Sequence, residues 1–120
     1  MHELSVAQEI INIVNNFLPA NKPANVKAVK VKVGKLSNIL NDSLTFCFEA
    51  LTNESHLKGA KLDIVDVPVK VLCLNCNEES EIENPVFACP KCNQTKLKMI
   101  SGMELQVDEI ELFDEIEEVT

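Results

Sequence analysis

Four of the five cysteines form two Cys-x2-Cys pairs within the stretch CLNCNEESEIENPVFACPKC at residues 73–92. These four residues are Cys73, Cys76, Cys89 and Cys92. Each pair can hold one ion with two sulfurs from a single tight turn, and two pairs complete a tetrahedral shell of four sulfurs. Thiolates select zinc or iron, and we expect zinc. Its role should be structural, because four cysteines leave no open coordination position for catalysis.

An asparagine follows the second cysteine of each pair, at Asn77 and Asn93. That position often needs a left-handed backbone, which asparagine tolerates better than most residues. The two turns therefore match in local chemistry as well as in cysteine count. The alternative interpretation is two unrelated pairs of free thiols, or a redox Cys-x2-Cys motif.

The chain begins MHELS, which places one of its two histidines, His2, directly after Met1. Because histidine is large, we expect Met1 to be retained with a free α-amine. That amine, the His2 amide nitrogen and the His2 imidazole can close two chelate rings in one plane, an arrangement that suits Ni(II) or Cu(II). Glu3 adds a carboxylate. The plainer interpretation is an idle terminal histidine, with Glu3 only offsetting a helix dipole.

The remaining cysteine and histidine show weaker signals. Cys47 lies on a predicted apolar helix face between Phe46 and Phe48, where a single cysteine usually acts as a small hydrophobic residue. His56 lies in the polar connection ESHLKG and reads as a solvated loop residue. We therefore expect neither side chain to carry chemistry.

Composition limits the classes of partner. The net charge is −8, from 19 acidic and 11 basic residues, and every basic residue is lysine. Such a chain is a poor match for polyanionic nucleic acid, which is bound through lysine and arginine. No apolar run reaches the ~20 residues that span a bilayer, and the N-terminus lacks a signal-peptide pattern. We therefore expect a cytoplasmic protein whose cysteines bind metal instead of forming disulfides.

Hydrophobic periodicity predicts two helices separated by a strand. The first helix covers residues 4–18, and the strand covers the β-branched run at 26–33. The second helix is expected to start at Asn41 or Asp42, either of which can cap it. The predicted apolar stripe of the first helix is Leu4, Ala7, Ile10, Ile11, Val14, Phe17 and Leu18. That of the second helix is Leu44, Cys47, Phe48 and Leu51.

The second half of the chain predicts strands. Residues 61–72 read as one long strand, in which Pro68 removes a backbone donor and so requires an edge position or a bulge. Strands are also expected from residue 96 onward. Residues 104–112 alternate with a phase slip near Glu109, which predicts another bulge. The acidic tail at 114–120 is expected to be frayed.

Motifs spread over nearly the whole chain form a combination that is more specific than the cysteine pairs alone. They are MHELS at the start, CFEAL at 47–51, GAKLDIVDVPVKVLCLNC at 59–76, CPKC at 89–92 and SGMELQVDEIEL at 101–112. In this combination the chain resembles the HypA/HybF family. Members of that family are nickel-insertion accessory proteins for nickel–iron hydrogenase.

The resemblance implies an α+β fold, with two helices packed on a small, mainly antiparallel sheet and an inserted zinc-ribbon-like loop of four cysteines. It implies a nickel-binding lobe formed by residues 1–72 and 96–120, and a zinc-binding loop domain at residues 73–95. Ni(II), the cargo, is then expected at Met1, His2 and Glu3. Structural Zn(II) is expected at Cys73, Cys76, Cys89 and Cys92.

The resemblance also implies a function. The chain should be a metallochaperone and not an enzyme. It should deliver Ni(II) to the hydrogenase large subunit and work with a HypB-type GTPase. Some members also take part in the maturation of urease, so urease accessory proteins are further expected partners. The chain departs from the family in lacking the proline often found at 37–43 and in having no arginine, and neither departure touches the expected ligands. Whether it is a monomer or a homodimer stays open.

Three other functions fit parts of the pattern. The first is a zinc-ribbon module that binds a protein or a nucleic acid and has no nickel function, which the charge disfavours. The second is a rubredoxin-like iron carrier, whose loops usually carry glycine where this chain has asparagine. The third is an enzyme, for which the sequence offers neither a nucleophile–base pair nor a phosphate loop.

Overall fold

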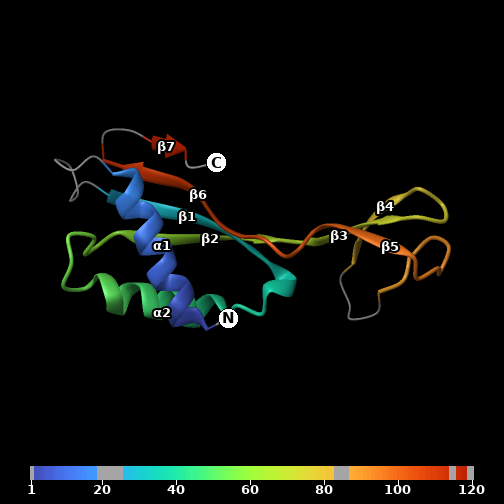
Figure 1. Cartoon of the computed structure of the whole chain (residues 1–120), viewed down its shortest axis with the longest axis horizontal. Helices are drawn as coiled ribbons and strands as arrows, with labels where there is room; N and C mark the ends of the chain where they lie inside the picture. Colours follow the sequence, from blue (N-terminus) through green and yellow to red (C-terminus); the bar gives the residue numbers. More distant parts are fainter. Residues whose placement is uncertain (1, 19–25, 83–86, 114–115, 119–120) are drawn as a thin grey trace.

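The computed structural model describes residues 2–18, 26–82, 87–113 and 116–118. They form an elongated molecule of 55 × 25 × 17 Å, in which two lobes are joined end to end (Figure 1). Its helices are α1 (Glu3–Phe17), the 3-10 helix η1 (Lys35–Ser37) and α2 (Asn41–Thr52). Its strands are β1 (Val26–Gly34), β2 (Lys61–Val67), β3 (Val69–Cys73), β4 (Glu79–Ile82), β5 (Leu97–Ser101), β6 (Leu105–Leu112) and β7 (Ile116–Glu118).

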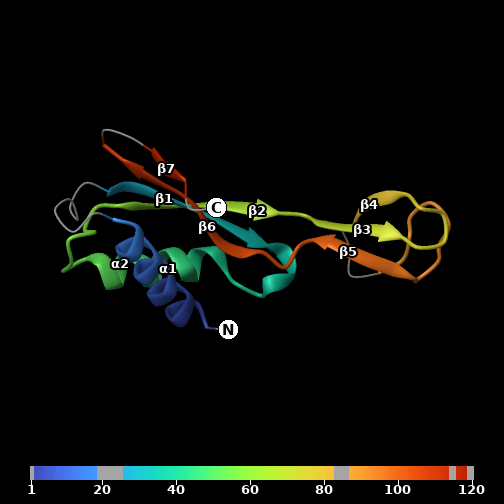
Figure 2. The ribbon, with the colours of Figure 1, turned by 45° about the horizontal axis from the view of Figure 1, so that its top comes forward.

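The first lobe is a four-stranded sheet in the order β2-β1-β6-β7, with both helices on one face (Figure 2). Strands β1 and β2 are parallel and the other pairs are antiparallel. The parallel pair is connected through α2, as a parallel connection requires a crossover. Alternate residues of β1, namely Val29, Val31 and Val33, are buried in the core under the helices. The predicted α+β class with a mainly antiparallel sheet is confirmed.

Helix α1 begins one residue before its predicted start. Its buried residues are Val6, Ala7, Ile10 and Val14. The predicted stripe was wrong at Leu4 and Phe17, which are 50% and 49% exposed. It was right at Ile11 and Leu18, which pack partly against the core. The sheet covers the narrower i, i+4 row from Val6 to Val14. No helix in the described ranges is both long and apolar enough to cross a bilayer.

Helix α2 buries Leu44 and Phe48, as predicted, while Cys47 and Leu51 pack partly against the same core. Its cap differs from the prediction. The N-cap residue is Leu40, whose side chain makes no capping bond, so neither Asn41 nor Asp42 caps the helix. Asp42 instead lies in the first turn, where its charge offsets the helix dipole.

The predicted long strand at residues 61–72 is in fact two strands that belong to different sheets. Strand β2 ends at Val67 and β3 begins at Val69, so the break falls at Pro68, which cannot donate to a continuous ladder. Strand β3 is the centre of a second, antiparallel sheet in the order β4-β3-β5. The chain therefore passes from one lobe to the other at this proline.

Two expectations for the C-terminal strands have different outcomes. The bulge predicted near Glu109 is confirmed, because Lys30 pairs with Glu109 while Val31 pairs with Val107, which leaves Asp108 as the extra residue. The frayed tail was wrong in part. Residues 116–118 form β7, which pairs antiparallel with β6.

The two lobes are joined by a close backbone contact. The Gly34 N–H donates to the Glu104 carbonyl (2.7 Å), and the Leu36 N–H donates to the Gly102 carbonyl (2.8 Å). The side chain of Leu36, which belongs to the first lobe by sequence, packs against the small core of the second sheet. That core consists of Val69, Val71 and Ile82. The strand crossover at Pro68 is therefore reinforced by a second connection through η1.

Candidate metal centre

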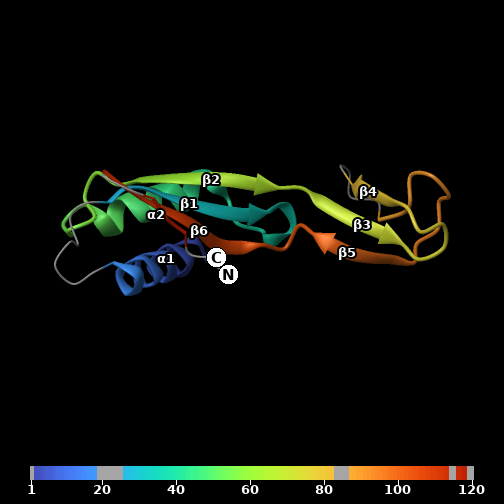
Figure 3. The same ribbon diagram turned by 90° about the horizontal axis from the view of Figure 1, so that it is seen from above.

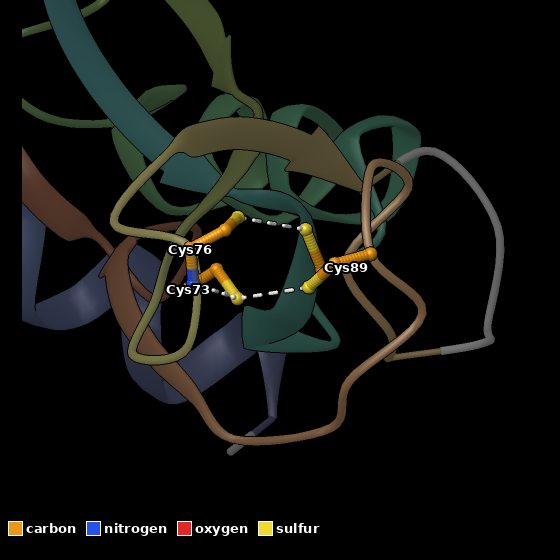
Figure 4. Close-up of side chains that lie close together, drawn as sticks. Cys73, Cys76 and Cys89 are labelled. Atoms are coloured by element: carbon orange, nitrogen blue, oxygen red, sulfur yellow. Dashed lines mark hydrogen bonds between the residues drawn. The ribbon is translucent and has the colours of Figure 1, made fainter.

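The four paired cysteines come together at the far end of the second lobe. Their sulfur atoms all lie within 4.8 Å of one another. Cys73 Sγ is 3.5 Å from Cys92 Sγ, and Cys76 Sγ is 3.7 Å from Cys89 Sγ. Figure 4 shows the side chains of Cys73, Cys76 and Cys89 converging from two facing turns. The two pairs therefore form one site.

The sulfur spacing fits a single tetrahedral ion. Metal–sulfur bonds of about 2.3 Å in a tetrahedron give sulfur–sulfur edges of about 3.8 Å. The contacts of 3.5 and 3.7 Å lie close to that value. Cys73 and Cys89 are buried, and Cys76 and Cys92 are partly buried, so the sulfurs are largely shielded from water. The donor set can hold a metal ion with little rearrangement.

The two turns have the same backbone, as the matching asparagines predicted. Asn77 and Asn93 have positive φ angles of 62° and 63°. The Asn77 N–H donates to the Cys73 carbonyl (2.9 Å), and the Asn93 N–H donates to the Cys89 carbonyl (2.8 Å). This geometry leaves the two sulfurs of each pair on the same side of the turn.

The second sheet places the turns opposite each other. Cys73 is the last residue of β3 and pairs with Leu97 at the start of β5. The Leu74 N–H donates to the Lys96 carbonyl (2.9 Å). On the surface, the Lys91 ammonium lies 3.1 Å from the Glu78 carboxylate, which joins the two turns by an exposed ion pair. Strand β3 therefore leads into the first turn, and the second turn leads into β5, which is paired with β3.

Backbone donors favour ionised sulfur at two of the four cysteines. The N–H of Cys76 lowers the pKa of Cys73, against the effect of burial, from 9.0 to about 6. The N–H groups of Lys91 and Cys92 lower the pKa of Cys89. At Cys76 the N–H of Glu78 lowers the pKa, but burial and the neighbouring thiols raise it to about 12. The cluster is therefore prepared for a cation, because only a positive ion allows all four sulfurs to ionise together.

The N-terminal residues lie in the other lobe, where His2 is exposed and Glu3 is partly buried. A Glu3 carboxylate oxygen lies 3.4 Å from the Leu40 N–H at the start of α2. His2 and Glu3 border an open hollow of about 440 Å³. Its other lining residues are Leu4, Asp42, Ser43, Phe46 and Cys47. Met1, the third predicted nickel ligand, lies outside the described residues.

Within the described ranges, the four cysteines are the one group of three or more potential ligands whose donor atoms converge. Asp42 and Cys47 border the same hollow as His2 and Glu3, but the donor atoms of these described residues do not converge as those of the four cysteines do. Cys47 packs partly against the helical core, as expected. His56 is exposed, but its Nε2 lies 2.8 Å from Asn15 Oδ1 on α1, a contact that the sequence pattern did not indicate.

The comparisons with known proteins agree on one family. The family model described as "Hydrogenase/urease nickel incorporation, metallochaperone, hypA" matches residues 1–112. A hydrogenase maturation factor HypA from Desulfatibacillum aliphaticivorans is 42% identical over 116 residues, which cover 95% of this chain and 88% of that protein. Another from Azotobacter chroococcum is 39% identical over 93% of this chain and 99% of that protein.

A solved structure shows the same fold. It is the solution structure of the nickel metallochaperone HypA from Helicobacter pylori. It is 27% identical, covers 93% of this chain and 97% of its own, and superposes with a TM-score of 0.65. The match extends over both lobes, from the N-terminal helix to the cysteine cluster. This chain therefore belongs to the HypA family of hydrogenase maturation metallochaperones.

Proposed function

We propose that this chain binds Ni(II) at its N-terminus and delivers it to the large subunit of nickel–iron hydrogenase. The observation that carries the proposal is the family match from residue 1 onward, together with the exposed His2 at the start of α1. The proposed ligands are the Met1 amine, the amide and imidazole nitrogens of His2, and the Glu3 carboxylate. Delivery is a binding function, so no catalytic residue is assigned.

The backbone at His2 supports this assignment. Its φ and ψ angles of −91° and 144° place it outside the helix, and the first helical bond runs from the Val6 N–H to the His2 carbonyl (3.1 Å). The amide nitrogen of His2 is one of those that a helix start leaves without an intrahelical partner. A nickel ion that uses this nitrogen therefore displaces no bond of α1. An exposed terminal site with few ligands also suits release of the ion.

We propose that the cysteine cluster holds structural Zn(II). Zinc, once bound, would link the two turns covalently and neutralise part of the charge of four thiolates. Cys73, Cys76, Cys89 and Cys92 all serve as ligands, so the site has no open position for a substrate. A colourless, redox-inactive protein would support zinc, and a red protein with a reversible redox wave would identify the iron site of an electron carrier instead.

The proposed partners follow from the family. They are a HypB-type GTPase and the hydrogenase large subunit, and urease accessory proteins are a further expectation. The net charge of −8 gives a field that attracts cations and basic protein surfaces. A cytoplasmic location is part of the same proposal, since the reduced cysteines would persist there as metal ligands.

Metal stoichiometry on protein with an untagged, native N-terminus tests the proposal. Zinc is counted as purified, and Ni(II) is titrated into wild type, His2→Ala and His56→Ala. The expected result is one zinc in all three, and one nickel that only His2→Ala loses. Because His56 is an exposed histidine in the same lobe, it controls for general imidazole binding. Nickel affinity that survives His2→Ala would refute the terminal site, and absence of nickel uptake by wild type would refute the function.

A further inference from the structure

Strand β2 has the longest free edge among the described strands. It is an outer strand of the first sheet, and Figure 3 shows no labelled element beyond it. Its seven residues pair with β1 without a register shift. The other outer strands, β4, β5 and β7, have four, five and three residues, and β5 pairs with an irregular register. A long, regular free edge is a template for one more strand.

Helix α2 runs beside this edge and leaves an open hollow at each end of it. The Asn41 side chain at the start of α2 donates to Asp66 near the end of β2 (2.9 Å). Thr52 at the end of α2 lines the same hollow as Lys61 at the start of β2. Helix and strand therefore run antiparallel. The hollow beside Asp66 measures about 450 Å³ and the one beside Lys61 about 570 Å³, so an added strand would run past both.

The hollow beside Asp66 has an acidic lining. Asp42 and Asp66 both line it and are both exposed. Among the described residues neither carboxylate forms a salt bridge, and Lys35 is the one lysine in the lining. The amide of Asn41 bonds one oxygen of Asp66, which orients the carboxylate. This end of the edge therefore fits a basic side chain.

The hollow at the start of β2 has the opposite balance of charge. Lys58 and Lys61 line it together with Glu49 of α2, and both lysines are exposed. This end therefore fits an acidic side chain. Because antiparallel pairing is the more stable arrangement, an added strand should begin beside Asp66 and end beside Lys61.

We propose that β2 binds an extended segment of a partner protein as an added antiparallel strand, with a basic residue opposite Asp66 and an acidic residue opposite Lys61. Residues that lie opposite each other share one face of the sheet. Ile64 packs partly against the helical core, so the residue opposite it, two positions after the basic one, should be apolar. The acidic residue comes five positions after the basic one and lies with Lys61 on the face away from the helices. The expected pattern is therefore basic-x-apolar-x-x-acidic.

The acidic hollow adjoins the proposed nickel site. Asp42 and Ser43 line both this hollow and the one beside His2 and Glu3. Leu40, whose N–H lies 3.4 Å from the Glu3 carboxylate, also lines the acidic hollow. A bound segment would thus begin beside the nickel terminus, as suits a protein that exchanges nickel with this chain. Only this last point rests on the proposed function, since the free edge and its charges do not depend on nickel.

Fluorescence anisotropy with a labelled, end-capped peptide tests the proposal on the full, untagged chain without added nickel. The peptide TKTVTTET places lysine opposite Asp66, valine opposite Ile64 and glutamate opposite Lys61. The peptide TETVTTKT has the same composition with the two charged residues exchanged. We expect the first peptide to bind at least about tenfold more tightly than the second.

Variants of β2 test which carboxylate reads the peptide. Asp66→Lys should weaken binding of TKTVTTET at least about tenfold and strengthen binding of TETVTTKT. Asp63→Lys makes the same charge change on the same strand, but on the other face and opposite an uncharged threonine. It should change either affinity less than about threefold. Asn41→Ala controls for the contact that Asp66→Lys also removes, and it should weaken binding less than Asp66→Lys does.

Hydrogen exchange locates the bound peptide without any variant. Saturating TKTVTTET should slow exchange of β2 amides and leave the amides of β5 unchanged. Failure of both peptides to bind, equal binding of the two, or protection of β5 instead of β2 would overturn the proposal. An Asp63→Lys protein that loses binding as Asp66→Lys does would also overturn it. None of these measurements contains added nickel, so their failure is distinct from a failure of the proposed nickel function.

Discussion

Replacing Gly34 by alanine should break the backbone contact between the two lobes and lower the free energy of unfolding. Gly34 has an ordinary φ of −74°, so the substitution introduces no backbone strain of its own. The new methyl group, however, would overlap the carbonyl carbon and oxygen of Gly102 and lie 2.6 Å from the Met103 nitrogen. These are backbone atoms, which cannot turn away as a flexible side chain can. The junction must therefore open.

The size of the effect follows from what the junction holds. Opening it breaks two backbone hydrogen bonds, Gly34 to Glu104 and Leu36 to Gly102, each of which contributes about 1 kcal/mol. Withdrawing Leu36 from the core of the second sheet removes a partly buried leucine contact, which adds about 1 to 2 kcal/mol. We expect Gly34→Ala to lower the free energy of unfolding by about 3 kcal/mol.

Urea unfolding of the metal-loaded protein, followed by circular dichroism, measures this change. Gly59→Ala is the matched control, because Gly59 has a φ of +86° but nothing within 4 Å of an added methyl group. Gly59→Ala should lower the free energy of unfolding by about 1 kcal/mol, because alanine disfavours a left-handed backbone conformation. A Gly34→Ala protein that is no less stable than Gly59→Ala would refute the reasoning that the junction is closed by direct backbone contact.

Three further predictions concern the cluster and the core. Cys89→Ser should lose the bound metal and unfold residues 69–101 while the helical lobe persists, as read from amide exchange of the two lobes. In metal-free protein, the ultraviolet absorbance of a first thiolate should appear near pH 6, and Cys73→Ser should abolish it. Because the pKa of Cys73 is lower in the folded protein than in the unfolded chain, ionisation of this thiol stabilises the fold. That stabilisation is complete above pH 9 and is lost as the pH falls through 6. Phe48→Ala should cost about 3 to 5 kcal/mol in urea unfolding, whereas Phe46→Ala, at a side chain that is 70% exposed, should change stability by less than about 0.5 kcal/mol.

The parts of the structure that depend on local chemistry could be predicted from the sequence. Asn77 and Asn93 indicated the left-handed turns because that backbone conformation is decided within a few residues. The phase slip near Glu109 indicated the bulge for the same reason. Burial of Leu44 and Phe48 followed from helical spacing. In each case the signal and its structural result lie in one short segment.

The parts that depend on distant partners could not be predicted. Pro68 showed that a ladder is interrupted, but not that the chain leaves one sheet for another, because the identity of the neighbouring strands is not local information. The contact between Glu3 and the Leu40 N–H joins segments 37 residues apart. The exposure of Leu4 and Phe17 depends on how far the sheet extends beneath α1. Periodicity identifies an apolar face but not the area that covers it.

The packing of Leu36 has a consequence for the modularity of the protein. The small lobe completes its core with a side chain that the other lobe supplies. A fragment cut at Pro68 and Ser101 would carry all four cysteines but lack this leucine. Such a fragment should be a poor candidate for transplantation into another protein, even with metal present. A chimera between relatives should therefore take the segment 34–36 and the second lobe from the same parent.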